Sequence, residues 1–118
     1  KIEAEVNDYH RLLRLGIKMP VLLDVDRERE RILKEYIEGD TADELIRQDK
    51  MPPACLEQIR EMCRMLYAAN LNIDYYPTNF VVREGELYYI DFECNEYMEE
   101  WNFENWGVKY WSKMPQAL

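Results

Sequence analysis

The sequence predicts a single domain, or a large piece of one, of the α+β class, and three observations support this prediction. Apolar residues recur at helical spacing in residues 2–15 and again in residues 54–69. Short β-like runs are joined by charged or glycine-containing turns, most clearly within residues 80–90. A polar and irregular loop, residues 72–79, separates the second helix from that hairpin. Amphipathic helices beside short antiparallel strands are typical of the α+β class.

Composition limits the classes of function. With 118 residues, of which 47% are hydrophobic, the chain can bury one core. Its net charge of −9, with no basic cluster, disfavours a nucleic-acid partner. No apolar run approaches membrane-spanning length and no signal peptide is visible, so we expect no membrane partner. The chain starts at Lys1 without Met, inside a helical pattern, which we interpret as the middle of a larger protein.

The cysteines indicate a reducing compartment. Cys55, Cys63 and Cys94 are odd in number and lack the paired spacing of a zinc site. We therefore expect reduced thiols, buried as small hydrophobic residues, in a cytoplasmic protein. His10 lies on the first predicted helix with no second histidine or nucleophile at useful spacing, so we interpret it as an exposed helix residue.

The first half of the chain divides into a helix, two strands and a short helix. The helix of residues 2–15 should end at Gly16, since glycine favours the left-handed conformation at a helix end. Residues 20–25 and 31–37 are expected to form an antiparallel pair around a charged turn. Asp40 or Thr41 is suited to cap the short helix that follows.

The second half begins with the long helix. Pro52 and Pro53 are placed to start it, because proline is favoured in the first turn. The hairpin of residues 80–90 should turn at Glu84–Gly85. Residues 98–111 are aromatic-rich, and we predict a helix whose aromatic side chains are mostly core, with the alternative that some of them line an acceptor pocket.

Three polar residues suggest the chemistry. Asp74 and Asn79 lie five positions apart in the irregular loop, and Asp91 closes an apolar strand after the glycine turn. Carboxylate and amide oxygens are ligands that Mg²⁺ accepts, usually together with nucleotide phosphates. This order of elements predicts magnesium-dependent phosphoryl transfer.

The motifs resemble a known family. Residues 72–79 (NIDYYPTN) are similar to the His-Gly-Asp-x-x-Pro-x-Asn loop of the aminoglycoside phosphotransferase and choline kinase branch of the protein-kinase-like fold. Residues 90–93 (IDFE) resemble the Ile-Asp-Phe-Glu of that branch. The resemblance implies a protein-kinase-like α+β fold made mostly of the large, C-terminal lobe. Residues 1–37 would be a remnant of the small lobe with its hinge strand, and residues 38–118 the large lobe.

The resemblance also implies roles for individual residues. Asp74 would be the catalytic residue that orients and deprotonates the acceptor hydroxyl, and Asn79 and Asp91 would bind Mg²⁺. Backbone groups of the hinge would meet the adenine edge of ATP; its residues are Glu35, Tyr36 and Ile37.

Further roles concern the first helix and the catalytic loop. Glu5, with Glu3 as second candidate, would pair with a phosphate-binding lysine; a solvated helix glutamate is the alternative. Asn72 stands where the family usually has a histidine that supports the loop, and an amide can also form hydrogen bonds. The chain starts after the position of the family's glycine-rich loop and strand lysine.

Two functions follow from these expectations. The favoured one is an ATP- and Mg²⁺-dependent phosphotransferase acting on a hydroxyl of a small molecule or a protein. The alternative is a kinase-like binding or scaffolding protein without turnover.

Overall fold

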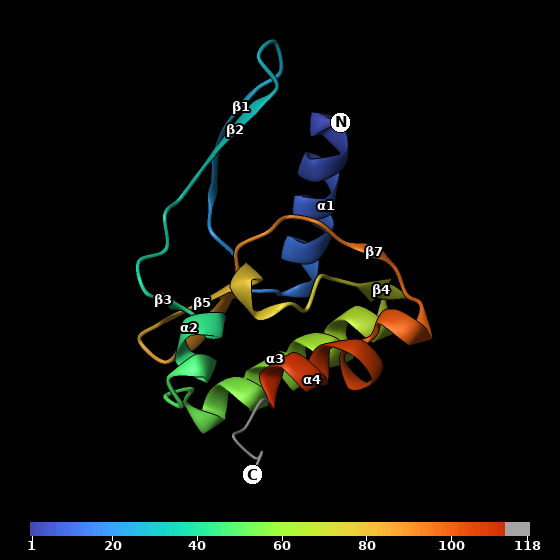
Figure 1. The fold of residues 1–118 in the computed structure, drawn as a ribbon. Coiled ribbons are helices and arrows are strands. Elements are labelled where there is room, and N and C mark those ends of the chain that lie inside the picture. The colour runs from blue at the N-terminus through green and yellow to red at the C-terminus, as the bar shows by residue number, and fades with distance from the viewer. Residues whose placement is uncertain (113–118) are drawn as a thin grey trace.

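Residues 1–112 are described by a computed structural model, in which three small sheets are combined with helices (Figure 1). The prediction of an α+β fold is confirmed. In chain order the helices and strands are α1 (Ile2–Leu15), β1 (Leu22–Asp26), β2 (Arg31–Lys34), β3 (Asp40–Thr41), α2 (Ala42–Arg47), α3 (Pro53–Ala68), β4 (Leu71–Asn72), β5 (Phe80–Arg83), β6 (Glu86–Tyr89), β7 (Asn95–Glu96) and α4 (Val108–Trp111).

Helix α1 forms where its apolar spacing predicted it. Its buried face carries Ile2, Val6, Tyr9 and Leu12. Gly16 ends it with φ 97° and donates its N–H to the carbonyl of Leu13 at 3.0 Å. This left-handed cap is strained for residues with a Cβ, so glycine is the residue suited to this position.

Strands β1 and β2 pair antiparallel, as expected, with Val25 opposite Ile32. The hairpin projects beside the N-terminal end of α1 in Figure 1, where Arg27 pairs with Glu3, and Leu23 and Leu33 are more than half exposed. Strand β2 ends at Lys34, earlier than the predicted residue 37, because the chain leaves the hairpin after one further backbone bond, from Glu35 to the carbonyl of Val21.

The two following helices begin at their predicted caps. Thr41, and not Asp40, caps α2, since its hydroxyl accepts the N–H of Glu44 at 3.2 Å while the Glu44 carboxylate accepts the N–H of Thr41. Helix α3 begins at Pro53. None of the helices in the described part of the chain is both long and apolar enough to cross a membrane.

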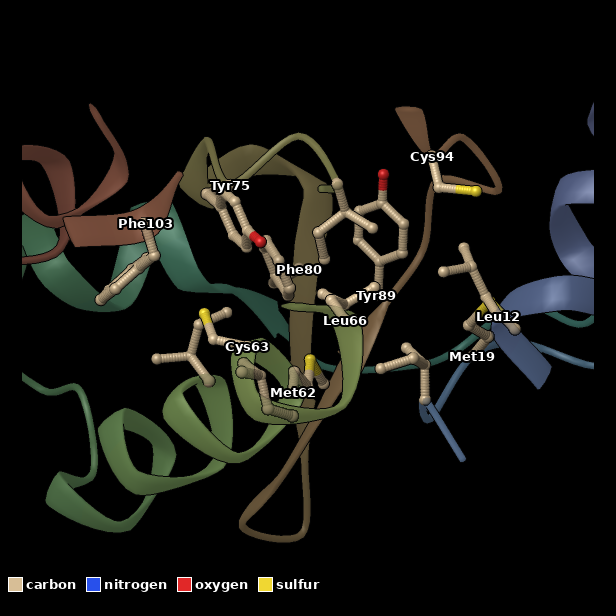
Figure 2. Packing of buried hydrophobic residues seen from close by; sticks show 14 of the residues in the cluster. Leu12, Met19, Met62, Cys63, Leu66, Tyr75, Phe80, Tyr89, Cys94 and Phe103 are labelled. Atoms are coloured by element: carbon tan, nitrogen blue, oxygen red, sulfur yellow. The ribbon is translucent and has the colours of Figure 1, made fainter. Parts of the chain in front are cut away.

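The hairpin β5–β6 forms the centre of the core. It turns at Glu84 and Gly85, as predicted, with Phe80 opposite Tyr89. Strand β3 extends the sheet by pairing with β5. Phe80, Tyr89 and Tyr75 are fully buried and pack above Leu66 of α3 (Figure 2).

The prediction of one helix over residues 98–111 is wrong. Asn102 interrupts the segment in extended conformation and accepts the N–H of Asn105 at 2.7 Å, so it caps a new turn. The expectation of an aromatic core holds in part. Phe103 and Trp111 are buried, whereas Trp101 is 52% exposed.

All three cysteines are buried and free, as predicted. Burial raises the pKa of Cys63 and Cys94 to about 11 and raises that of Cys55 as well. Since the thiolate is the reactive form, we expect negligible labelling by a thiol reagent at pH 8 in the folded protein and labelling of all three in denaturant. Rapid labelling of Cys63 without denaturant would contradict this burial.

Candidate active site

Asp74 lies in the irregular loop between β4 and β5. Its neighbours Ile73 and Tyr75 are buried, while Asp74 itself is exposed. The backbone N–H of Tyr76 donates to Asp74 Oδ1 at 3.1 Å, which fixes the carboxylate within the turn. The loop is therefore anchored on both sides of Asp74 and presents its side chain outward.

Asn72 supports this loop from inside. It is only 4% exposed, its Nδ2 donates to the carbonyl of Met98 at 3.0 Å, and its Oδ1 accepts the hydroxyl of Tyr75 at 3.3 Å. The expectation that an amide can form hydrogen bonds at this position is confirmed.

Asn79 connects the loop to the strand that leads to Asp91. Its backbone carbonyl accepts the N–H of Ile90 at 2.9 Å, and its side-chain Nδ2 donates to the carbonyl of Asp74 at 3.3 Å. Asp91 follows Ile90 directly, so the β5–β6 pairing brings Asn79 and the Asp91 segment to the same end of the hairpin. The structure thus places all three predicted site residues in one region.

Tyr89 joins the two loops of the site. The N–H of Asp74 donates to the Tyr89 hydroxyl at 3.4 Å, and that hydroxyl donates to the carbonyl of Glu93 at 2.8 Å. Burial raises the pKa of Tyr89, and the negative charges of Asp91, Asp74 and Glu93 raise it further. The phenol therefore keeps its proton at neutral pH, and this proton makes the bond to Glu93.

Carboxylates are crowded at this site. The charge of Asp91 is the largest cause of the raised pKa of Glu93, followed by burial and by the charge of Asp74. A raised carboxyl pKa of this origin means that like charges repel one another. A bound cation would relieve this repulsion.

The oxygen donors fit Mg²⁺. No group of three or more His, Cys, Asp or Glu side chains within residues 1–112 is arranged to hold a metal ion. The amide of Asn79 and the carboxylate of Asp91 are two hard oxygen ligands, which is the usual protein share for Mg²⁺ when phosphates and water complete the shell. Their assignment as ligands stays a prediction.

Two cavities are lined by residues next to Asp91 in the chain: Glu93 lines one and Ile90 lines the other. The larger has a volume of about 600 Å³ and is lined by Asp74, Glu93, Trp101 and Trp106, among others. The smaller has about 250 Å³, and its walls include Val81 and Ile90 and the segment from Glu35 to Ile37.

The predicted hinge residues Glu35, Tyr36 and Ile37 line the smaller cavity. The Tyr36 side chain is 81% exposed. The Glu35 carboxylate accepts the N–H of Val21 at 3.0 Å and pairs with Arg83 at 3.4 Å. The hydrogen bond from Val21, together with the interaction with Arg83, holds the pKa of Glu35 below its usual value. The Glu35 side chain is therefore occupied within the protein, and the expected contact of this backbone with adenine stays a prediction.

The candidates on α1 differ in their surroundings. The Glu3 carboxylate is paired with Arg27 of the hairpin turn, and this bond lowers its pKa. Glu5 instead lines a cavity of about 260 Å³ together with Lys34. Its predicted role beside a phosphate-binding lysine stays a prediction.

Sequence reasoning did not single out Lys34, which contacts the residues on both sides of Asp91. Its Nζ donates to the carbonyl of Ile90 at 2.6 Å and lies 4.6 Å from the centre of the Phe92 ring. The feature of the sequence that could have drawn attention to Lys34 is its position directly before the predicted hinge residues Glu35, Tyr36 and Ile37. Its contact with Ile90 joins residues far apart in the sequence, so no local pattern indicates it.

No protein-family model matches the chain. A search of known proteins finds similarity to the KEOPS complex subunit Bud32 of Pyrococcus abyssi, with 31% identity over 98 residues. The matched region is 79% of this chain but 44% of the relative, so the chain spans less than half of the relative's length. The similarity to Bud32 supports a protein-kinase-like fold, without pointing to the aminoglycoside phosphotransferase and choline kinase branch in particular.

Proposed function

We propose that the protein is an ATP- and Mg²⁺-dependent phosphotransferase that transfers the γ-phosphoryl group to a hydroxyl. One observation carries the proposal: the two ends of the segment Ile90–Glu93 line two different cavities. Ile90 lines the smaller cavity, Glu93 lines the larger one, and Asp91 stands between them in the chain. A donor nucleotide and an acceptor in these cavities would meet beside Asp91.

The smaller cavity suits an adenine ring. Val81 and Ile90 give it apolar walls. Within residues 1–112, no hydrogen bond uses the N–H of Ile37 or the carbonyl of Glu35, so a donor and an acceptor remain for the edge of a base. In this proposal Glu35, Tyr36 and Ile37 form the hinge between a small-lobe part, residues 1–37, and a large-lobe part that begins at residue 38.

The larger cavity suits the acceptor. Asp74 in its wall would orient the acceptor hydroxyl and take its proton, the task of a general base. The described lining contains the carboxylates of Asp74, Glu93 and Glu96, two tryptophans, and no lysine or arginine. This charge favours a neutral or positively charged acceptor over an anionic one.

Asn79 and Asp91 would hold Mg²⁺. When bound, the metal ion would neutralise charge on the phosphate oxygens, which is the main electrostatic need of phosphoryl transfer. The residues of the chain would contribute by holding the metal ion and the acceptor in position. The bond from Asn79 to the Asp74 carbonyl ties the metal side of the site to the acceptor side.

A second candidate function is a binding subunit without turnover. Met98 and Trp101 are 49% and 52% exposed and lie on the wall of the larger cavity. Exposed aromatic and methionine side chains are enriched at protein interfaces, and the similar protein from Pyrococcus abyssi is named as a subunit of a complex. In this reading the larger cavity would receive part of a partner protein.

Nucleotide-dependent melting tests the favoured function. We expect ADP and ATP to raise the melting temperature in Mg²⁺ and much less in EDTA, since a ligand at one hundred times its Kd stabilises the folded state by about 2.7 kcal/mol. In Asp91→Ala the Mg²⁺-dependent part of the shift should be lost. Equal melting temperatures with and without saturating nucleotide would refute the proposal, and nucleotide binding without any phosphoryl transfer would favour the second candidate.

A further inference from the structure

We propose that Lys34 is a positioning residue for Asp91: its ammonium group fastens the chain on both sides of Asp91 to the β1–β2 hairpin. Because it assigns a metal-binding role to Asp91, this inference rests on the proposed function. It adds a residue and a coupling that the catalytic-loop motifs do not contain.

The contacts of Lys34 lie on either side of Asp91. Nζ donates to the carbonyl of Ile90, the residue before Asp91, at 2.6 Å. It also lies 4.6 Å from the ring centre of Phe92, the residue after Asp91. Phe92 is fully buried, so its ring is a fixed support for the ammonium group. These two contacts restrict the peptide that orients the Asp91 carboxylate.

The charge of Lys34 is not neutralised by an ion pair. Among residues 1–112 no carboxylate lies within 4.0 Å of its Nζ, although Glu5 and Glu30 line the same cavity. Lysine has three N–H donors, and the bond to Ile90 uses one. The ammonium is thus held by a backbone carbonyl and an aromatic face.

Lys34 also lies where the hairpin meets the proposed nucleotide site. It ends β2 and contributes to two cavities, the one shared with Glu5 and the one proposed for adenine. A movement of the hairpin would therefore be transmitted through Lys34 to the Asp91 segment.

A role in positioning and a role as a simple counter-charge predict opposite effects on metal binding. If Lys34 acted only through its charge, its removal would reduce repulsion of Mg²⁺ and lower the Mg²⁺ concentration that nucleotide binding requires. If it positions Asp91, its removal raises that concentration, as happens when residues that orient metal ligands are replaced.

The experiment compares Lys34→Met, which keeps the apolar stem, with Lys34→Arg, which keeps a cation. Lys18→Met is the control, since Lys18 forms an exposed ion pair with Glu86 at 3.5 Å. The readout is the Mg²⁺ concentration for half of the ADP-induced rise in melting temperature. We expect an increase of about tenfold in Lys34→Met, substantial recovery in Lys34→Arg and no change in Lys18→Met. An unchanged or lower concentration in Lys34→Met would overturn the inference.

Hydrogen exchange without nucleotide separates this inference from the proposed function. The N–H of Ile90 bonds to the Asn79 carbonyl, and the N–H of Cys94 bonds to Asp8 Oδ2 at 3.3 Å, so both report on the Asp91 segment. We expect exchange at these amides to be faster by about tenfold in Lys34→Met than in wild type or Lys18→Met. Equal exchange would remove the fastening role even if Mg²⁺-dependent nucleotide binding is found, and faster exchange would support it even if that binding is absent.

Discussion

Replacing Asp74 with asparagine is expected to lower the rate of phosphoryl transfer by about 10²–10⁴-fold, the usual contribution of a general base. Asparagine has the same shape, and its Oδ1 can still accept the N–H of Tyr76, so the loop should keep its conformation. The amide cannot take the proton of the acceptor hydroxyl. The measurement is phosphate transfer from ATP by the full-length protein, with nucleotide affinity determined in parallel.

The pattern across three variants makes this test specific. Asp74→Asn should lose turnover while nucleotide affinity and its Mg²⁺ dependence stay near wild type. Asp91→Ala should lose both turnover and the Mg²⁺ dependence. Asp24→Asn, on the exposed face of β1, is the matched control and should retain all three properties. Unchanged turnover in Asp74→Asn would remove the catalytic role from this residue.

The elements that the sequence predicted well are those with local signals. Gly16 ends α1, Thr41 and Glu44 cap α2, and Glu84–Gly85 turns the β5–β6 hairpin. Each signal acts through residues at most a few positions away, so a single sequence contains all the information it needs. The region that holds Asp74, Asn79 and Asp91 was predictable for a related reason: a motif loop and a hairpin of fixed length bring these residues to one place.

The features that the sequence did not predict depend on distant contacts. Whether Trp101 or Trp111 is buried depends on which of them meets the β5–β6 hairpin, and their spacing in the chain does not encode this. The bond between Lys34, at the end of β2, and Ile90, which follows β6, likewise joins residues 56 positions apart in the chain. The helix predicted over residues 98–111 failed at Asn102, whose side chain competes for backbone N–H groups.

Trp111, in the aromatic C-terminal segment, supports the loop that carries Asp74. Trp111 is 3% exposed, and its Nε1–H donates to the carbonyl of Tyr75 at 2.7 Å. Its ring packs edge-on against Phe80, with ring centres 5.3 Å apart. Tyr75 follows Asp74 directly, so Trp111 fastens the loop next to the proposed catalytic carboxylate.

Trp111→Ala is therefore expected to lower the free energy of unfolding by about 3–5 kcal/mol, the usual cost of removing a large buried aromatic side chain. Such a loss is a large fraction of the roughly 5–15 kcal/mol that stabilises most domains. Chemical denaturation followed by circular dichroism measures it. Trp101→Ala is the matched control, because the same substitution at a half-exposed position should cost well under about 1 kcal/mol.

A third variant separates the hydrogen bond from the packing. Trp111→Phe keeps an aromatic ring but leaves the buried carbonyl of Tyr75 without its donor, which costs about 1–3 kcal/mol. If Trp111 holds the Asp74 loop, Trp111→Phe should also reduce phosphoryl transfer under conditions in which the protein remains folded. Equal stability losses in Trp111→Ala and Trp101→Ala would contradict the difference in burial between the two side chains. Full activity in Trp111→Phe would limit Trp111 to a structural role, because the loop would then keep its geometry without the bond to Tyr75.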